Sequence, residues 1–558
     1  MRSVRHRFDR ATTRGFTASA AKGWLSAAVA APAPGARSFH RSSLSSGPSS
    51  ISSFRADRDL PAVLGTELIV GGRVVRAGAA TEGRGDNSLR WRSWAVGEWI
   101  GQTGRIRAND NATYGALAVD HITQGDERKS VCSDATTLFQ ETFRPQFHYT
   151  ARTGWINDAN GMIHYKGWWH LFHQHRPPGS PATVWGHAAS DDLLHWRHLP
   201  TAIPCEENDA IFSGSGLVDW ENASSLRRGD DPPFLFFYTL HPDAKSGRKA
   251  TQCMAYSTDG ARTFEKFSGN PILSTRDNND RDPKVFWHKP TRAWFMVLSL
   301  SRNNADREHA TYGLFRSKDL RSWALLQEIG PGAWYWECPD MFEMPVDGDP
   351  ARTKWILAKG SGPKTETPNA YPGMPFNQQM SFPRELTLRT TPDGPRLFRQ
   401  PVPEIEMLYA REHQSPVRAL NPGDNPLAGI GHDLLDIELE MEPQGAERVN
   451  LVLRGEEITY EIKDAKLKAF GRTLSLPLTD GRLVLRTLLD RASIELFGNR
   501  GEVTHSGVFF PDPSDRSFSL TVSGGQAHLH RLVVRELRSI FSQDFIRAET
   551  TKIRTHIQ

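Results

Sequence analysis

The chain has 558 residues and a formal net charge of +4. Its first 50 residues hold eight Lys or Arg side chains and a single acidic residue, Asp9, so the rest of the chain is close to neutral. This distribution argues against the basic surface that is typical of nucleic-acid-binding proteins. No stretch reaches the about 18 consecutive apolar residues of a membrane-spanning helix. We therefore expect neither a nucleic-acid nor a membrane partner.

The amino-terminal segment, residues 1–58, is predicted to be a targeting or disordered segment. It is rich in Arg, Ser and Ala and poor in acids, which is the composition of a transit peptide. A secretory signal with Trp24 to Ala31 as its apolar stretch and an unprocessed disordered tail are the alternatives. Glycosylation sequons at Asn111 and Asn222 weakly favour secretion. The compartment is therefore open between an organelle and the extracellular space.

Short alternating strands begin near Leu60, and residues 59–128 are predicted to form a partial jelly-roll-like β module. Gly71 and Gly72 between two such runs are typical of a hairpin turn. The strands are too few for a complete sandwich. A fragment of a domain, or a cover for the unit that follows, explains them equally well.

Residues 142–402 are predicted to form a β-propeller. Strands recur at even spacing, and three related turns begin at Ser190, Ser257 and Ser317, each with an Asp two residues later and a closing aromatic. Their period of about sixty residues is that of propeller blades enlarged by loops. Ser and Asp side chains bond the backbone of such turns.

Three acidic motifs follow one another in the propeller region: Trp155 to Gly161 with Asp158, Arg281 to Lys284 with Asp282, and Glu337 to Asp340. Retaining glycoside hydrolysis needs two carboxylates about 5 Å apart, one as nucleophile and one as acid/base. Each motif has a plainer explanation, since Asp158 could cap its own turn and Arg281 could form a surface ion pair with Asp282. Glu337 follows three aromatic residues, and apolar surroundings should raise its pKa.

Together these motifs resemble glycoside hydrolase family 32, which includes invertases, levanases and inulinases. The resemblance extends from Phe143 to Arg538 and includes the segments 170–174, 185–188 and 212–216. It implies an all-β fold, a five-bladed propeller followed by a β-sandwich, and hydrolysis of fructan or sucrose. By position, Asp158 resembles the nucleophile, Glu337 the acid/base, and Asp282 the acid that holds the fructose hydroxyls.

The resemblance also implies a set of substrate-binding residues in which amides, hydroxyls and an aromatic face surround the sugar. These residues are Trp155, Asn157, Gln174, Trp185, Phe212, Ser213 and Arg281. For Trp185, packing within a blade is the alternative. The resemblance accounts for several of the seven histidines between His164 and His198 without a metal. The four cysteines lack the paired spacing of zinc or redox sites and are expected to be mostly buried free thiols. We expect no metal and no cofactor.

Residues 403–538 are predicted to form the trailing β-sandwich, and 539–558 a loose tail. Asp490 and Glu495 lie in a signature of that sandwich and are expected to support it and its interface. Two departures from the family pattern stand out. Ala159 replaces a proline, and the stretch between Lys359 and Tyr371 is short by nearly one blade of about 40 to 50 residues.

The shortened blade leaves an alternative to the enzyme, which is a non-catalytic fructan-binding descendant or a truncated gene product. A related propeller hydrolase that acts on arabinans with inversion is the other alternative. The sequence leaves open the preference among sucrose, levan and inulin, exo or endo cleavage, and hydrolysis or transfer.

Overall fold

The computed structural model describes residues 139–541 except 276–278, 301–309, 333–335 and 362–370, together with seven upstream segments. Those segments are 6–7, 15–19, 24–30, 64–79, 90–95, 103–110 and 118–125. The regular structure of this part of the chain is strands and a few short 3-10 helices, joined by turns and loops. None of its helices is long and apolar enough to cross a membrane.

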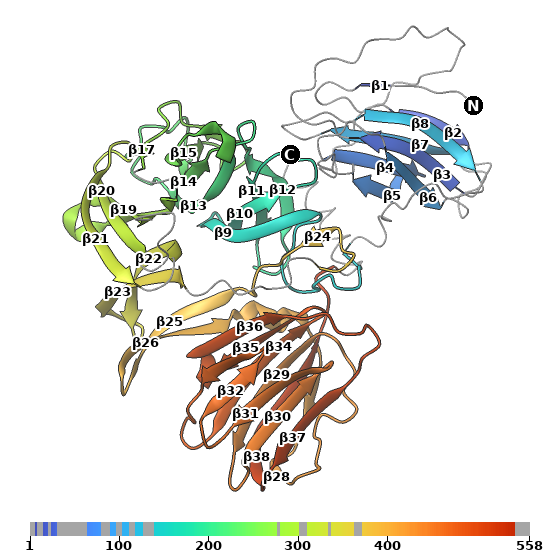
Figure 1. The fold of residues 1–558 in the computed structure, drawn as a ribbon, viewed down its shortest axis with the longest axis vertical. Helices are drawn as coiled ribbons and strands as arrows, with labels where there is room; N and C mark the ends of the chain where they lie inside the picture. The colour runs from blue at the N-terminus through green and yellow to red at the C-terminus, as the bar shows by residue number, and fades with distance from the viewer. Residues whose placement is uncertain are drawn as a thin grey trace.

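The upstream segments form two four-stranded sheets, which Figure 1 shows as a separate lobe in blue. Gly71 and Gly72 have φ values of 58° and 79°, as the predicted hairpin turn requires. Strands from residues 6–30 pair with strands from 90–125, so the sheets include residues that the sequence assigned to a targeting or disordered segment. The strand order of the first sheet is β1 (His6–Arg7), β8 (Ala118–Gly125), β3 (Trp24–Ala30), β6 (Arg90–Ala95). The strand order of the second is β2 (Gly15–Ser19), β7 (Thr103–Asp110), β4 (Leu64–Val70), β5 (Arg73–Ala79).

Three further sheets follow in chain order and lie in an arc in Figure 1. The first contains β9 (Gly154–Tyr165), β10 (Trp168–Arg176), β11 (Val184–Ser190) and β12 (Arg197–Ile203), with β24 (Phe376–Asn377) added in parallel to β9. The second contains β13 (Ala210–Val218), β14 (Phe234–His241), β15 (Thr251–Ser257), β16 (Glu265–Lys266) and β17 (Leu273–Ser274). The third contains β18 (Arg281–His288), β19 (Ala293–Leu300), β20 (Ala310–Ser317) and β21 (Ala324–Gly332).

The three predicted turns close these sheets as expected. In each, the Asp side chain accepts hydrogen bonds from backbone amides further along the turn, and the Ser hydroxyl bonds to the Asp. The residues are Ser190 and Asp192, Ser257 and Asp259, and Ser317 and Asp319. The repeat in the sequence therefore marks the same corner of three successive blades.

The fourth sheet is built from two hairpins, one on each side of the shortened region in the sequence. Its order is β23 (Asp349–Ser361), β22 (Trp336–Val346), β25 (Arg384–Thr391), β26 (Gly394–Pro401). The hairpins meet in parallel through one residue pair, Val346 with Leu388. β19 is buried throughout, whereas 349–360 of β23 contains no fully buried residue. Within the described residues the propeller thus has four sheets, and the fourth lacks the cover that the other three have.

The sandwich consists of a seven-stranded and a five-stranded sheet (Figure 1). The first is β27 (Tyr409–Gln414), β38 (Ala527–Leu537), β29 (Leu435–Glu442), β34 (Leu483–Asp490), β35 (Ser493–Gly498) and β36 (Val503–Val508), with β28 (Arg418–Leu420) on β38. The second is β33 (Arg472–Ser475), β32 (Lys466–Ala469), β31 (Glu456–Glu461), β30 (Arg448–Leu453) and β37 (Phe518–Ser523). Alternate residues of both sheets fill the core between them.

Asp490 and Glu495 support the junction of sandwich and propeller, as predicted. Asp490 accepts hydrogen bonds from the amides of Gln146 and Phe147, and Glu495 accepts one from the amide of Phe382. The first residues of the predicted loose tail also pack here. Ile540 is buried, and its amide donates to the carbonyl of Gln146. Residues 542–558 lie outside the described part of the chain.

Candidate active site

The first strand of each propeller sheet carries a two-residue bulge near its start. In β18, Arg281 pairs with Ser299 and Lys284 with Val297, so two residues face the single residue between those partners. The same shift occurs in β9, β13 and β22. The bulged pairs are Asn157–Asp158, Phe212–Ser213, Asp282–Pro283 and Cys338–Pro339. A bulge turns a side chain out of the regular alternation, which explains how the predicted motifs converge.

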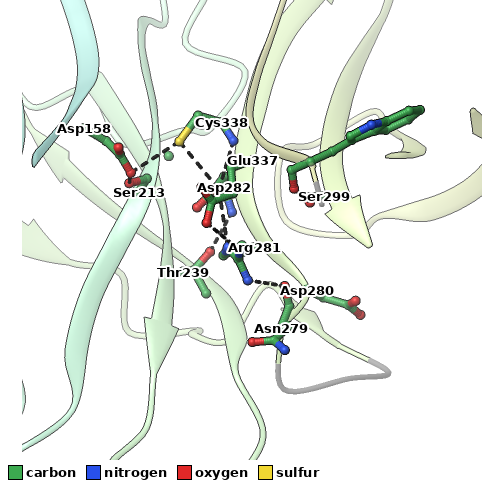
Figure 2. Close-up of polar contacts among 12 residues, drawn as sticks. Asp158, Ser213, Thr239, Asn279, Asp280, Arg281, Asp282, Ser299, Glu337 and Cys338 are labelled. Atoms are coloured by element: carbon green, nitrogen blue, oxygen red, sulfur yellow. Dashed lines mark hydrogen bonds and ion pairs between the residues drawn. The ribbon is translucent and has the colours of Figure 1, made fainter. Parts of the chain in front are cut away.

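Cys338 connects two of the three predicted catalytic acids (Figure 2). Its Sγ lies 3.3 Å from Oδ2 of Asp158 and 3.6 Å from Oδ2 of Asp282. Its backbone amide donates to the same Asp282 oxygen at 2.9 Å. Ser213 Oγ donates to Oδ2 of Asp158 at 2.5 Å. The two aspartates therefore face one another across a single thiol.

Arg281 connects the third acid, Glu337, to Asp282. Its Nη2 lies 2.6 Å from Oε1 of Glu337, and its Nε lies 3.7 Å from Oδ2 of Asp282. Lys284 and Asp340, from the same two motifs, form a second ion pair of 2.7 Å beside them. The chain thus brings the three predicted acids into one connected group.

Asp282 is the most deeply buried of these acids, with 4% of its side chain exposed. Burial raises its pKa to about 6, and the charges of Asp158 and Glu337 act in the same direction. Arg281 and the amide of Cys338 lower it, but only in part. A carboxyl group that titrates near neutral pH in a cluster of acids is typical of a functional site.

The surroundings expected for Glu337 were wrong. Its side chain is 32% exposed and paired with Arg281, so it does not lie in an apolar pocket. Trp334 and Tyr335, on which that expectation partly rested, lie outside the described residues. Trp336 is buried, but its ring lies under the ammonium group of Lys359. The buried acid of the site is Asp282 instead. Its burial could not be predicted from neighbouring aromatic residues, because none stands next to it in the sequence.

Two site residues have backbone conformations that favour glycine. Asp282 has φ of 65° and Cys338 has φ of 46°. Non-glycine residues in this region are strained, and such residues cluster at functional sites. Burial also raises the pKa of the Cys338 thiol, which keeps it neutral, and its single proton can be donated to either aspartate but not to both at once. Sequence reasoning had treated Cys338 only as a free thiol. It is free, as are Cys205 and Cys253, whereas Cys132 lies outside the described residues.

The predicted substrate-binding residues divide into two groups. Asn157 is exposed and donates to Gln174 at 3.1 Å, and Trp155 is partly exposed at the start of β9. Phe212 is partly exposed and stacks on His241, with ring centroids 4.3 Å apart. Trp185 differs, because its side chain is completely buried among aromatic residues of two blades. Its indole Nε1 donates to the carbonyl of Phe212, so its position matches the packing role that the sequence left open.

Three histidines of the first blade, His170, His173 and His187, belong to its core. His170 Nδ1 lies 3.0 Å from His187 Nε2, and His173 Nε2 lies 2.9 Å from the hydroxyl of Tyr149. Burial lowers the pKa of His170 to about 4 and that of His173 to about 3, so both are neutral at ordinary pH. No cluster of three or more His, Cys, Asp or Glu suited to a metal ion occurs in the part of the chain that the structure describes.

Sequence reasoning missed three buried polar residues of the second blade that touch the Asp282 segment, namely Ser215, Thr239 and Gln252. Thr239 is one small polar residue in the apolar run of β14, and such residues are common in strands. Strand pairing places it opposite the bulge of β13, and only the folded structure shows that its hydroxyl also accepts a hydrogen bond from the amide of Asp282 in β18.

Comparison with known proteins agrees with this fold. The glycosyl hydrolases family 32 N-terminal domain matches residues 148–371, and the family 32 C-terminal domain matches residues 404–536. A levanase of Bacillus subtilis is 30% identical over 499 residues, which cover 73% of this chain and 72% of the levanase. An extracellular exo-inulinase of Aspergillus niger is 25% identical over 528 residues, which cover 72% of this chain and 96% of the inulinase.

Two solved structures share the fold. The exo-inulinase of Aspergillus awamori has a TM-score of 0.64 at 22% identity, and the alignment covers 72% of this chain and 100% of that one. The fructofuranosidase of Schwanniomyces occidentalis has a TM-score of 0.61 at 23% identity, covering 72% and 99%. A propeller joined to a sandwich, with clustered acids at the starts of the propeller strands, defines a glycosidase. The chain belongs to glycoside hydrolase family 32 and is of the β-fructofuranosidase type.

Proposed function

We propose that this protein hydrolyses terminal β-fructosides with retention of configuration, through a covalent fructosyl-enzyme. The observation that supports this most directly is the joining of Asp158, Asp282 and Glu337 through Cys338 and Arg281. A retaining glycosidase needs a nucleophile and an acid/base on one bond of the substrate, and a third acid can stabilise the charge that develops on the sugar.

In the first step, an Asp158 oxygen attacks the anomeric carbon of the fructosyl unit while the bond to the leaving oxygen breaks. Glu337 transfers its proton to that oxygen, so the aglycone leaves as a neutral alcohol. In the second step, the Glu337 carboxylate takes a proton from water, whose oxygen attacks the same carbon and releases Asp158. The hydrogen bond from Ser213 orients Asp158 for the attack.

Asp282 has a different role in this proposal, because its buried carboxylate accepts hydrogen bonds from hydroxyls of the sugar ring. Those bonds strengthen as positive charge develops at the anomeric carbon. Arg281 fixes Asp282 and Glu337 relative to one another. Asn157, Gln174, Ser213, Phe212 and Trp155 are proposed to line the fructose site, with Trp185 behind Phe212.

The substrate class follows from the relatives, which include levanases, exo-inulinases and an invertase. We expect purified protein to release fructose from levan, inulin or sucrose. The anomer that forms first, followed by NMR, should be β-fructofuranose. An inverted first product would exclude Asp158 as a nucleophile.

The Glu337→Gln variant should lose about 10²- to 10⁴-fold in rate, the usual contribution of a general acid. Asp158→Asn should lose at least as much, because no covalent intermediate can form. Asp347→Asn is the matched control, since this acid lies in an exposed turn of the fourth sheet. Wild-type protein that binds fructans in affinity electrophoresis but releases no fructose would support the non-catalytic alternative.

A further inference from the structure

The backbone around Asp282 is held by side chains of the preceding blade. We propose that Thr239, together with Gln252 and Ser215, is a positioning residue that sets the places of Asp282 and Arg281. This inference deepens the proposed function and rests on it for the catalytic roles of those two residues. Thr239 lies on β14, Gln252 on β15 and Ser215 on β13, all in the second blade.

The bulge in β18 creates the need for such support. Asp282 and Pro283 face only one residue, Leu298, on the neighbouring strand, so their backbone groups leave the regular ladder. A buried amide or carbonyl without a partner costs as much as a lost hydrogen bond. The groups left over by the bulge therefore have to be bonded from another element.

Thr239 and Gln252 bond the backbone on both sides of Arg281. The amide of Asp282 donates to Oγ1 of Thr239 at 3.0 Å. That hydroxyl donates to Oε1 of Gln252 at 2.7 Å, and Nε2 of Gln252 donates to the carbonyl of Asp280 at 3.0 Å. The direction of every bond is fixed, since the hydroxyl has one proton and Gln252 uses both ends of its amide.

Ser215 holds the next part of the same segment. Its hydroxyl donates to the carbonyl of Pro283 at 2.8 Å and accepts from the amide of Val285 at 3.0 Å. The Ser215 hydroxyl, which belongs to the second blade, takes the place of backbone partners that the bulge removes from the ladder. Figure 2 shows Thr239 directly beside the Asp282 and Arg281 side chains.

Burial makes these bonds hard to replace. Thr239 and Gln252 are completely buried and Ser215 is 5% exposed, so the site offers bulk water no access to the freed backbone groups. Asp282 also has a strained φ of 65°, which persists only where the surroundings impose it. Loss of the Thr239 hydroxyl should let the segment relax and displace the carboxylate of Asp282 from Cys338 and Arg281.

The test compares Thr239→Val with Thr239→Ser in the full-length protein. Valine keeps the shape and removes the hydroxyl, and serine restores it. Displacement of a catalytic group by about 1 Å can cost about 100-fold in rate, so we expect kcat of Thr239→Val on sucrose to fall by that order at temperatures well below its unfolding. Thr239→Ser should recover to within a few-fold of wild type.

Thr311→Val is the matched control, because Thr311 is a buried propeller threonine whose hydroxyl has no hydrogen-bond partner among the described residues. It should keep kcat within about twofold. The inference is overturned if folded Thr239→Val keeps wild-type kcat, if serine does not rescue it, or if Thr311→Val falls equally. If Thr239→Val does not fold, Ser215→Ala takes its place, with an expected loss of kcat beyond that of Thr311→Val and with wild-type kcat as the overturning result.

A second measurement separates this inference from the proposed function. Hydrogen–deuterium exchange of the peptide containing Asp282 should speed up in Thr239→Val and not in Thr311→Val, because the Asp282 amide loses its acceptor. This readout needs no turnover. Unchanged exchange would overturn the inference even in an active enzyme, whereas faster exchange in a protein that releases no fructose would leave the positioning role intact and reject only the function.

Discussion

At the scale of single residues, Asp282 differs from the other two acids of the site in its surroundings. Glu337 is partly exposed and has an arginine partner at 2.6 Å, whereas Asp282 is buried against Cys338 with Arg281 at 3.7 Å. Burial therefore dominates at Asp282 and raises its pKa to about 6. This places a change of its charge within the pH range in which the enzyme would be assayed.

We predict that kcat/KM on sucrose falls as the pH drops through about 6. Only the ionised Asp282 accepts hydrogen bonds at both oxygens from sugar hydroxyls, and below its pKa the carboxyl is protonated. The measurement is a pH profile from 4 to 8, with Asp282→Asn assayed alongside. The residual activity of that variant should lack the limb near pH 6. A limb that persists in Asp282→Asn would assign it to another group.

At the scale of elements, the sequence predicts the local motifs at the bulges but not the residues that contact them. Motif residues such as Asp158 and Glu337 stand out because turn formers or aromatic residues surround them. The repeat at Ser190, Ser257 and Ser317 marked the blades, since those side chains bond their own turns. Local patterns of this kind can be recognised in a single sequence.

The residues that contact the bulges from other strands cannot be recognised in this way. A register shift depends on which residues two strands place opposite one another, and Thr239 and Gln252 lie far from Asp282 in the sequence. The same reason explains Trp185, which lies in a motif predicted to bind the sugar but is buried between blades. Side chains of the second blade bury Trp185, and the motif around Trp185 does not predict that contact.

We predict that the fourth sheet opens more readily than the other three. Its two hairpins share a single parallel residue pair, Val346 with Leu388, and β23 has no fully buried residue in 349–360. Few buried contacts lower the free energy of local opening. Hydrogen–deuterium exchange should therefore be faster in peptides of β23 and β25 than in β14 or β19. Equal protection in all four sheets would contradict the prediction that the fourth sheet opens more readily.

At the scale of the whole molecule, the described contacts that connect the three acids lie mostly within the first three sheets. Every contact among Asp158, Asp282 and Glu337 runs through residues of the first three sheets and the start of β22. The propeller is in turn joined to the sandwich by a shared core and by the buried pair of His148 and Asp490. The junction also contacts the fourth sheet, since Arg384 at the start of β25 forms an ion pair of 3.1 Å with Glu495 of the sandwich.

The junction should make the protein's stability depend on pH. Burial lowers the pKa of His148, but the hydrogen bond to Asp490 at 2.7 Å and the nearby carboxylate of Glu495 at 3.6 Å outweigh burial and raise it to about 9, against 6.5 in the unfolded chain. A pKa raised by folding stabilises the protein fully below about pH 6.5, and this contribution is lost as the pH rises through 9. At about 1.4 kcal/mol for each pKa unit, the loss amounts to about 3 kcal/mol.

We therefore predict that the unfolding temperature of the wild-type protein falls between pH 6.5 and pH 9. His148→Gln should be less stable at pH 6.5, because Asp490 and Glu495 lose their positive partner, and should show little slope across the same range. His413→Gln is the control, since it removes a partly exposed pair with Glu536 on the sandwich surface, and it should keep the wild-type slope. A His148→Gln variant with the wild-type slope would show that another group controls the junction.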